Sequence, residues 1–245
     1  MRAILTYHSL DTSGSPISLP PDAFRAHVRW LARAPVQVLT LDALVQAPPD
    51  RPAVALTFDD AFANFETEAL PALREHGLPV TLFVPTGHVG GSNAWGGHSE
   101  AGIPTLPLLD WDGVGRVAEA GVTLGAHTVS HPHLTACADD RLLDELTTAP
   151  QVLRQRTGQT VDTVAYPYGD ADTRVRSAAE RVYRLACSTR FALLAGDEPL
   201  DLPRLDAFYF REGARLEAFG TPAFARWVRF RARLRALRRA LRRHA

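Results

Sequence analysis

The stretch Ala53-Val-Ala-Leu-Thr-Phe-Asp-Asp60 joins six residues typical of a buried strand to two adjacent carboxylates. An apolar run of this length suits a strand covered on both faces, and such strands belong to parallel sheets packed by helices. Ionised carboxylates are costly to desolvate, and an adjacent pair is tolerated at a strand end, beside a cation or sharing a proton. The pattern therefore marks Asp59 and Asp60 as candidate site residues at the end of a core strand.

Strand-like and helix-like segments alternate along the rest of the chain, without an internal repeat. This alternation predicts an α/β fold, with a parallel sheet or barrel inside and helices outside. The further strands are expected over residues 4–7, 80–84, 122–126, 163–166 and 185–188. Residues 87–107 are rich in Gly, Ser, Asn and Pro, and so long a loop in a compact domain is typical of a rim or lid over a site.

Polar side chains follow several of these strands. His8, the Asp59–Asp60 pair, His127 and Tyr168 each lie at or just past the carboxyl end of an expected strand. In parallel barrels the carboxyl ends of the strands carry the active site. We therefore expect these side chains to gather at one face of the molecule.

Composition indicates a globular protein with one compact α/β domain and a sizeable core, because 46% of its 245 residues are hydrophobic. We find no stretch of 18 apolar residues and no signal-peptide pattern at the start, and on that basis expect a cytoplasmic protein. Cys137 and Cys187 lie far apart and are expected to be reduced. All 27 basic residues are Arg, which favours a G+C-rich bacterial genome as the source.

The net charge of zero conceals a strong asymmetry. Residues 226–245 carry nine Arg and no acid, which leaves 27 − 9 = 18 Arg against 27 acids elsewhere. We divide the chain into a catalytic domain over residues 1–220 and a basic amphipathic helix over residues 221–245. That helix is expected to dock on the acidic body, with peripheral contact of Arg226 to Arg243 with an anionic membrane as the alternative. Nucleic acid is not an expected partner, since no base-reading motif accompanies the charge.

The segment His127-Thr-Val-Ser-His131 holds two imidazoles four residues apart, which can converge on one ion or simply lie in a solvated loop. A carboxylate from a neighbouring strand end favours the first interpretation. Two His and one carboxylate form a site with open positions, suited to a catalytic divalent ion. One of the two Asp residues would bind the ion, and the other would stay free to deprotonate water.

Three motifs together resemble those of the polysaccharide deacetylases, carbohydrate esterase family 4. They are Leu56-Thr-Phe-Asp-Asp60, Gly125-Ala-His-Thr-Val-Ser-His131 and Ala165-Tyr-Pro-Tyr-Gly169, in this order. The resemblance implies a distorted (β/α) barrel of about seven parallel strands. It also implies metal-dependent removal of N-acetyl groups from amino sugars, with zinc preferred over cobalt or nickel.

Roles for individual residues follow from the same resemblance. It implies that Asp59 is the general base and that Asp60, His127 and His131 bind the metal. The third motif would form a wall of the substrate groove through Tyr166 and Pro167. The backbone N–H of Tyr168 would stabilise the oxyanion.

The sequence departs from the family pattern at three points. Ala165 stands where the third motif commonly has an Arg that orients the base, and Arg204 is the suggested substitute. Ala61 replaces the usual Gly after the two Asp residues, which is tolerated unless that position needs a positive φ. No Leu-x-His motif for the general acid follows Tyr168.

Family members with permuted motif order, including the poly-N-acetylglucosamine deacetylases, have the acid first in the chain. Leu5-Thr-Tyr-His8 resembles their first strand, so His8 is the candidate acid, with a buried structural histidine as the alternative. Trp95 and Trp111 are candidates for stacking on sugar rings or for packing. Two further functions stay open, a non-catalytic carbohydrate-binding relative and an esterase or amidase for another acyl group. Oligomeric state cannot be predicted from these patterns.

Overall fold

The computed structural model covers the whole chain and describes all residues except 197, 213 and 244–245, with side chains described as far as Leu237 in the last helix. The strands are β1 (Arg2–Tyr7), β2 (Ser9–Leu10), β3 (Ser18–Leu19), β4 (Gln37–Val38), β5 (Ala53–Phe58), β6 (Thr81–Val84), β7 (Thr123–Ala126), β8 (Thr163–Ala165), β9 (Leu185–Cys187) and β10 (Leu205–Asp206). The α-helices are α1 (Pro21–Arg33), α2 (Leu41–Gln46), α3 (Leu70–Glu75), α4 (Trp111–Glu119), α5 (Asp139–Thr157), α6 (Thr173–Ala179), α7 (Ala214–Glu217) and α8 (Pro222–Arg243).

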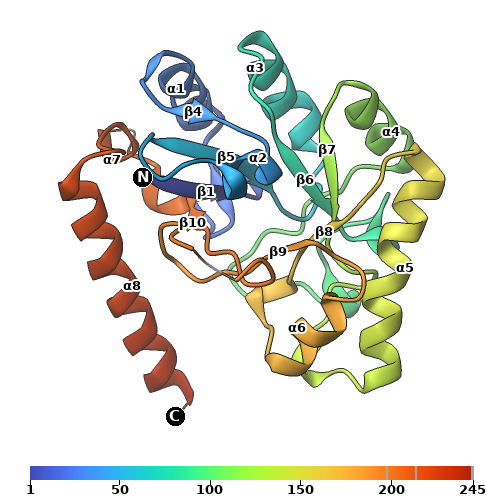
Figure 1. The fold of residues 1–245 in the computed structure, drawn as a ribbon. Coiled ribbons are helices and arrows are strands. Elements are labelled where there is room, and N and C mark those ends of the chain that lie inside the picture. The colour runs from blue at the N-terminus through green and yellow to red at the C-terminus, as the bar shows by residue number, and fades with distance from the viewer. Residues whose placement is uncertain (197, 213, 244–245) are drawn as a thin grey trace.

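One parallel sheet forms the centre of the molecule, in the order β10–β1–β5–β6–β7–β8–β9, and β4 pairs with the start of β5. The sheet curls on itself, and helices surround it (Figure 1). Hydrogen bonds from Leu202 N to Ala186 O (2.8 Å) and from Ser188 N to Leu202 O (2.9 Å) join β9 to the segment that leads into β10. The predicted distorted barrel of about seven parallel strands is therefore confirmed.

Alternate residues of the central strands face two different cores. On β5, Val54, Leu56 and Phe58 belong to the large core between the sheet and the helices, whereas Ala53 and Ala55 belong to a smaller core cluster. This period of two is that of a strand covered on both faces. Asp59 continues the parity of Ala53 and Ala55, and so its side chain lies on the inner side of the curled sheet.

Close packing inside the curled sheet explains why residue 125 is a glycine. A Cβ on Gly125 of β7 would lie 2.4 Å from the ring of Phe83 on β6. Phe83 is fully buried in the inner cluster, so its ring has no free space into which to move. Gly125 therefore lets Phe83 fill the interior below the carboxyl ends of the strands.

One predicted helix is shorter than expected. The pattern predicts a helix from Thr173 to Arg184, but α6 ends at Ala179 and a tight turn follows, with Tyr183 N donating to Ala179 O (2.8 Å). The buried Tyr183 side chain donates to Leu146 O of α5 (2.7 Å) and so fixes this turn against the neighbouring helix. A tertiary contact thus ends the helix where no Gly or Pro does.

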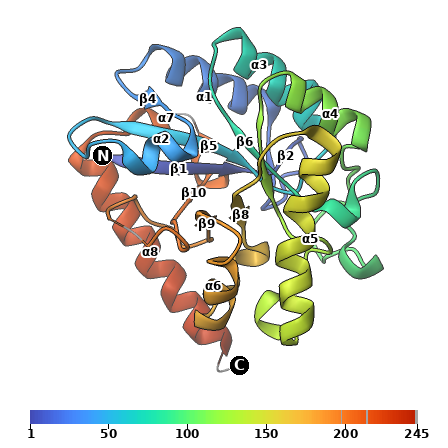
Figure 2. The same cartoon turned by 45° about the vertical axis from the view of Figure 1, so that its right-hand side comes forward.

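The expected basic helix is α8, which lies along the outside of the molecule on the β10 side (Figures 1 and 2). Its first turns pack on the body through Phe224 and Val228, both buried, with Phe210 and Phe219 as aromatic neighbours. Within the described residues, none of the helices is both long enough and apolar enough to cross a membrane.

Candidate active site

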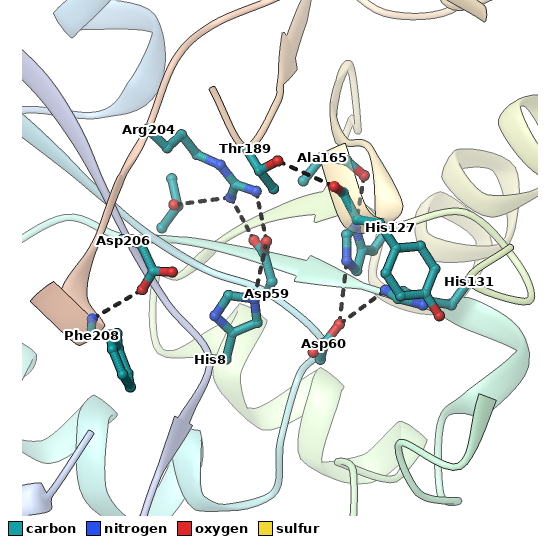
Figure 3. Close-up of polar contacts among 12 residues, drawn as sticks. His8, Asp59, Asp60, His127, His131, Ala165, Thr189, Arg204, Asp206 and Phe208 are labelled. Carbon is teal, nitrogen blue, oxygen red and sulfur yellow. Dashed lines mark hydrogen bonds and ion pairs between the residues drawn. The ribbon is translucent and has the colours of Figure 1, made fainter. Parts of the chain in front are cut away.

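The sheet register brings the predicted polar residues to one end of the barrel. β1 and β5 pair in parallel from Arg2–Ala53 to Tyr7–Phe58, so His8 and Asp59 leave the sheet side by side. Asp59 N donates to Tyr7 O (2.9 Å), and His127 N donates to Val84 O (3.0 Å) at the end of β6. Figure 3 shows the side chains of these residues converging at the carboxyl ends of the strands.

Arg204 holds Asp59 in a two-pronged ion pair. Its NH1 and NH2 groups lie 2.6 and 2.7 Å from Oδ1 and Oδ2 of Asp59, and its Nε donates to Ser188 O (3.1 Å). Both side chains are buried. Burial raises the pKa of Asp59, but the Arg204 guanidinium, together with the charges of His127 and His8, outweighs burial and holds that pKa well below its usual range. Asp59 is therefore ionised and fixed in orientation at neutral pH.

Arg204, suggested as a substitute for the Arg missing at Ala165, thus pairs with Asp59. Ala165, at that motif position, is fully buried in the inner cluster, and its carbonyl accepts a hydrogen bond from His127 Nδ1 (2.7 Å). The guanidinium of Arg204 instead enters from the segment before β10, above the Phe83 ring at 5.7 Å. The sequence suggested Arg204 as a substitute. It could not show that Arg204 lies beside Asp59, because 145 residues separate the two.

His8 lies on the other side of Asp59. Its Nε2 is 3.8 Å from Asp59 Oδ2, and its side chain is 23% exposed. A histidine buried for structural reasons alone would be enclosed, whereas His8 lines the pocket above Asp59. The half-buried carboxylate of Asp206 lies nearby (Figure 3), and desolvation raises the pKa of Asp206 while the charge of His8 acts in the opposite direction.

Asp60, His127 and His131 form the group that could hold a metal ion. Asp60 Oδ1 lies 3.3 Å from His127 Nε2 and 3.5 Å from His131 Nε2, and all three side chains are buried. One potential ligand atom from each residue lies within 4.8 Å of the others. Burial and the charge of His127 lower the pKa of His131 to about 3, so this imidazole is neutral.

The chemistry of these atoms fits a cation. The carbonyl of Ala165 accepts the Nδ1 proton of His127, which leaves Nε2 of the neutral ring with a lone pair facing Asp60. Asp60 Oδ1 and His131 Nδ1 are buried without a hydrogen-bond partner among the described groups. Burial lowers the pKa of His127, but the contact with Asp60, the charge of Asp59 and the hydrogen bond to Ala165 together raise that pKa by more, so the two carboxylates favour positive charge at this point.

Backbone strain is concentrated in the three motifs. Among the described residues other than Gly, positive φ angles occur at Asp60 (70°), Ala61 (55°), Thr128 (64°), His131 (55°) and Tyr168 (58°). Such conformations cost about 1–3 kcal/mol each and persist where the surrounding structure enforces them. The position after the Asp pair does need a positive φ, and Ala61 adopts it at a cost that the usual Gly would avoid.

Glu145 is a site-supporting residue that the sequence analysis missed. This buried carboxylate on α5 accepts hydrogen bonds from the backbone N–H groups of Val129 (2.9 Å) and Ser130 (2.8 Å) and from the Ser130 hydroxyl. It therefore fixes the turn between the two metal-ligand candidates. A lone Glu in an amphipathic helix gives no sequence signal of this role, because its partners lie 15 and 16 residues earlier.

A pocket of about 190 Å³ opens over this cluster. The long loop after β6 closes one side of it with Trp95, Glu100 and Ile103, as expected for a rim. The Trp95 ring stacks on His131 with a centroid separation of 4.1 Å. Tyr168, 39% exposed, also lines the pocket and lies between His131 and the stacked ring of His133 (4.0 Å).

The four residues predicted to contact substrate lie at different places relative to the pocket. Trp95 and Tyr166 line the pocket, although the Tyr166 hydroxyl donates to Leu200 O (3.1 Å). Pro167 is buried and does not line the pocket. Trp111 lies outside it at the start of α4, packed against the core with the Arg156 guanidinium 5.2 Å from its ring. Of the two roles considered for Trp111, packing is the one its position supports.

These features define a class: a parallel α/β barrel with a buried Asp-His-His group and an Arg-paired Asp at the carboxyl ends of its strands. The family model for polysaccharide deacetylases matches residues 46–183, more than half of the chain. The chain therefore belongs to the polysaccharide deacetylase family, and the resemblance seen in the motifs is confirmed.

Individual relatives support this assignment at low identity. YxkH of Bacillus subtilis, a protein of the same family, is 25% identical over 80% of this chain and 67% of its own length. A poly-beta-1,6-N-acetyl-D-glucosamine N-deacetylase of Staphylococcus aureus is 26% identical over 62% of this chain. A peptidoglycan-N-acetylglucosamine deacetylase of Bacillus cereus is 25% identical over 56% of it. The chain spans about half the length of these last two proteins, 54% and 44%.

Solved structures share the fold over most of the chain. IcaB from Ammonifex degensii superposes with a TM-score of 0.74 over 89% of this chain and 96% of its own, at 18% identity. The deacetylase PplD of Streptococcus pyogenes, solved in complex with acetate, has a TM-score of 0.71 over 83% and 91%, at 22% identity. At such identities the likeness concerns the fold.

Proposed function

We propose that this protein is a metal-dependent hydrolase that removes N-acetyl groups from an amino-sugar-containing glycan or glycoconjugate and releases acetate. The observation that carries the proposal is that two adjacent carboxylates have different partners. Asp59 is paired with Arg204 beside the open pocket, while Asp60 faces two imidazoles with an unpartnered oxygen. Family membership supports a carbohydrate substrate.

Asp60, His127 and His131 would hold the ion, for which we propose zinc, with cobalt or nickel as substitutes. A divalent ion held there supplies Lewis-acid polarisation of an acetyl carbonyl and makes water more acidic. The protein's contribution is to fix the three ligands through the Ala165 carbonyl and the strained turn between the two His residues.

Asp59 is the proposed general base. Arg204 keeps its carboxylate ionised, so an oxygen lone pair is available to take a proton from water. The same ion pair lowers the basicity of Asp59, and fixed orientation compensates by holding the carboxylate in a single position. His8 is the proposed general acid that gives a proton to the departing amine nitrogen, and its partial exposure and its distance of 3.8 Å from Asp59 support that role.

The pocket walls account for binding of the sugar in this proposal. Trp95 offers an aromatic face, and Tyr168, which has a positive φ, lines the same pocket. We propose that the Tyr168 N–H stabilises the oxyanion. A pocket of about 190 Å³ is smaller than the sites of about 300–1,000 Å³ that enclose drug-sized ligands, so one sugar unit at a time would enter it.

Acetate release from paired substrates tests the proposal. Zinc-loaded and metal-stripped protein would be incubated with N-acetylated chito-oligosaccharides, β-1,6-linked N-acetylglucosamine oligomers and O-acetylated xylo-oligosaccharides. We expect zinc-dependent acetate release from the N-acetylated sugars. Release confined to the O-acetylated sugars would indicate an esterase. Absence of release from all three, with zinc still bound, would favour a non-catalytic carbohydrate-binding protein.

A further inference from the structure

The outward face of α8 combines exposed apolar side chains with arginine. Phe230 is 59% exposed and Leu237 is 58% exposed, and with Tyr168 they are the large hydrophobic residues exposed in the described part of the chain. They lie seven residues apart, which places them on one stripe of the helix. Arg226, Arg229 and Arg233 are exposed on the same side.

The opposite face of α8 is already occupied. Phe224 and Val228 are buried against the body, and Trp227 contacts Phe210 with a centroid separation of 5.5 Å. Two turns further along the helix, Arg235 lies over the rings of Phe191 and Tyr209, 5.5 Å from each centroid. Docking on the body therefore explains one face of the helix and leaves the stripe of Phe230 and Leu237 uncovered.

We propose that this outward face binds an anionic lipid surface, with Phe230 and Leu237 entering the interface and the arginines contacting lipid headgroups. A helix that presents large apolar residues within a strongly basic face is typical of interfacial binding. The inference does not rest on the proposed reaction.

The charge and the apolar residues of α8 favour an anionic lipid surface over a second copy of the chain or a soluble polyanion. The helix Pro222–Arg243 contains nine Arg and no acidic residue, so two copies of this face would repel each other. A soluble polyanion would satisfy the arginines but would leave Phe230 and Leu237 in water. The remainder of the chain has 18 Arg against 27 acids, so a negatively charged surface attracts α8 specifically.

The position of α8 relates such a surface to the pocket. Arg235 donates to Tyr209 (3.2 Å) and to the carbonyl oxygen of Thr189 (3.5 Å), and Thr189 lines the pocket over Asp59. The same helix that would contact lipid is thus attached to the rim of the site. A glycan carried by a lipid would be held near that rim once α8 is bound.

Vesicle co-sedimentation of the full chain tests the proposal. The vesicles would contain either phosphatidylcholine alone or a mixture of phosphatidylglycerol and phosphatidylcholine. We expect binding only to the anionic vesicles, weakened by added salt. Since each Arg near such a surface contributes about 1 kcal/mol, the variant R226E/R229E/R233E should bind at least about 100-fold more weakly. The charge-neutral variant F230Q/L237Q should bind about tenfold more weakly.

The matched control changes the same charge elsewhere. The variant R29E/R51E/R74E alters three exposed arginines of the body and should keep vesicle binding within about threefold of the unaltered protein. All changed side chains are exposed, and thermal unfolding would check that each variant folds. Equal losses in the α8 and control charge variants would overturn the proposal. Binding to a single-stranded oligonucleotide with no loss in F230Q/L237Q would also overturn it, and would indicate a polyanion site.

Discussion

At the scale of single residues, the Arg204–Asp59 pair decides how the site works. Both charges are buried, and each guanidinium nitrogen faces one carboxylate oxygen at 2.6 or 2.7 Å. A buried pair of this kind is costly to break, because removing one partner leaves the other charge without compensation. The pair therefore links the stability of the fold to the ionisation of the proposed base.

A double-mutant cycle measures this link. Arg204→Met should lower the free energy of unfolding by about 3–5 kcal/mol and acetate release by at least about 100-fold, since Asp59 loses both its partner and its orientation. Asp59→Asn should also destabilise. The double variant should be destabilised by less than the sum of the two single variants, measured by chemical denaturation. Additive losses would show that the pair has no net coupling.

At the scale of secondary-structure elements, α5 holds the turn that carries the two His residues. Glu145 accepts two backbone N–H groups and one hydroxyl from residues 129–130, between His127 and His131. Residues that orient metal ligands in this way typically affect metal affinity by about 10- to 100-fold. The helix therefore contributes to the site without contacting it.

Glu145→Gln tests this contribution. The amide presents one acceptor oxygen without a charge, so the turn should loosen and zinc affinity should fall about tenfold or more, as measured by isothermal titration. Asp144→Asn is the matched control, because Asp144 is exposed on the same helix and accepts from Thr148 (2.8 Å). An unchanged zinc affinity in Glu145→Gln would contradict the role given to Glu145.

A second element contact joins α1 to the short turn after β10. His27 Nε2 donates to Phe210 O (2.8 Å), and its Nδ1 accepts from the Tyr7 hydroxyl (3.2 Å). Burial lowers the pKa of His27, with the Phe210 carbonyl acting in the opposite direction. His27 is thus neutral in the folded protein over a pH range in which the unfolded chain is protonated.

The lowered pKa of His27 makes the stability of the fold depend on pH. The contribution of His27 to stability is complete above its unfolded pKa of about 6.5 and is lost as the pH falls toward its folded pKa. Stability should therefore fall between about pH 6.5 and pH 5 more steeply in the unaltered protein than in His27→Gln, by up to about 1.4 kcal/mol per pH unit. Urea unfolding at several pH values would compare the two slopes, and equal slopes would contradict the assignment.

At the scale of the whole molecule, the parts predicted from sequence are those encoded over short distances. The unbroken apolar run of residues 53–58 predicted a strand covered on both faces, and the family resemblance predicted that Asp60, His127 and His131 meet. Carboxyl ends of parallel strands lie together, so the face of the site followed from the strand assignments. The family resemblance then supplied the shape of the barrel.

The features that the sequence did not predict depend on contacts between segments that are distant in the chain. Arg204 could be suggested but not placed, since 145 residues separate it from Asp59. Nothing in the sequence indicated the role of Glu145. The position of Trp111 outside the pocket could not be predicted from its residue type. The end of α6 at Ala179 depends on the contact of Tyr183 with α5. Local propensity carries no information on such contacts, because the fold creates them.

Zinc content and acetate release, measured on the same preparations of two variants, test the central claim most directly. Asp59→Asn should keep one zinc per chain while releasing acetate about 100- to 10,000-fold more slowly, because it retains the ligands and loses the base. His131→Gln should lose both zinc and activity. A near-normal rate in Asp59→Asn, or a zinc content in His131→Gln equal to that of the unaltered protein, would contradict the assignment of base and metal ligands.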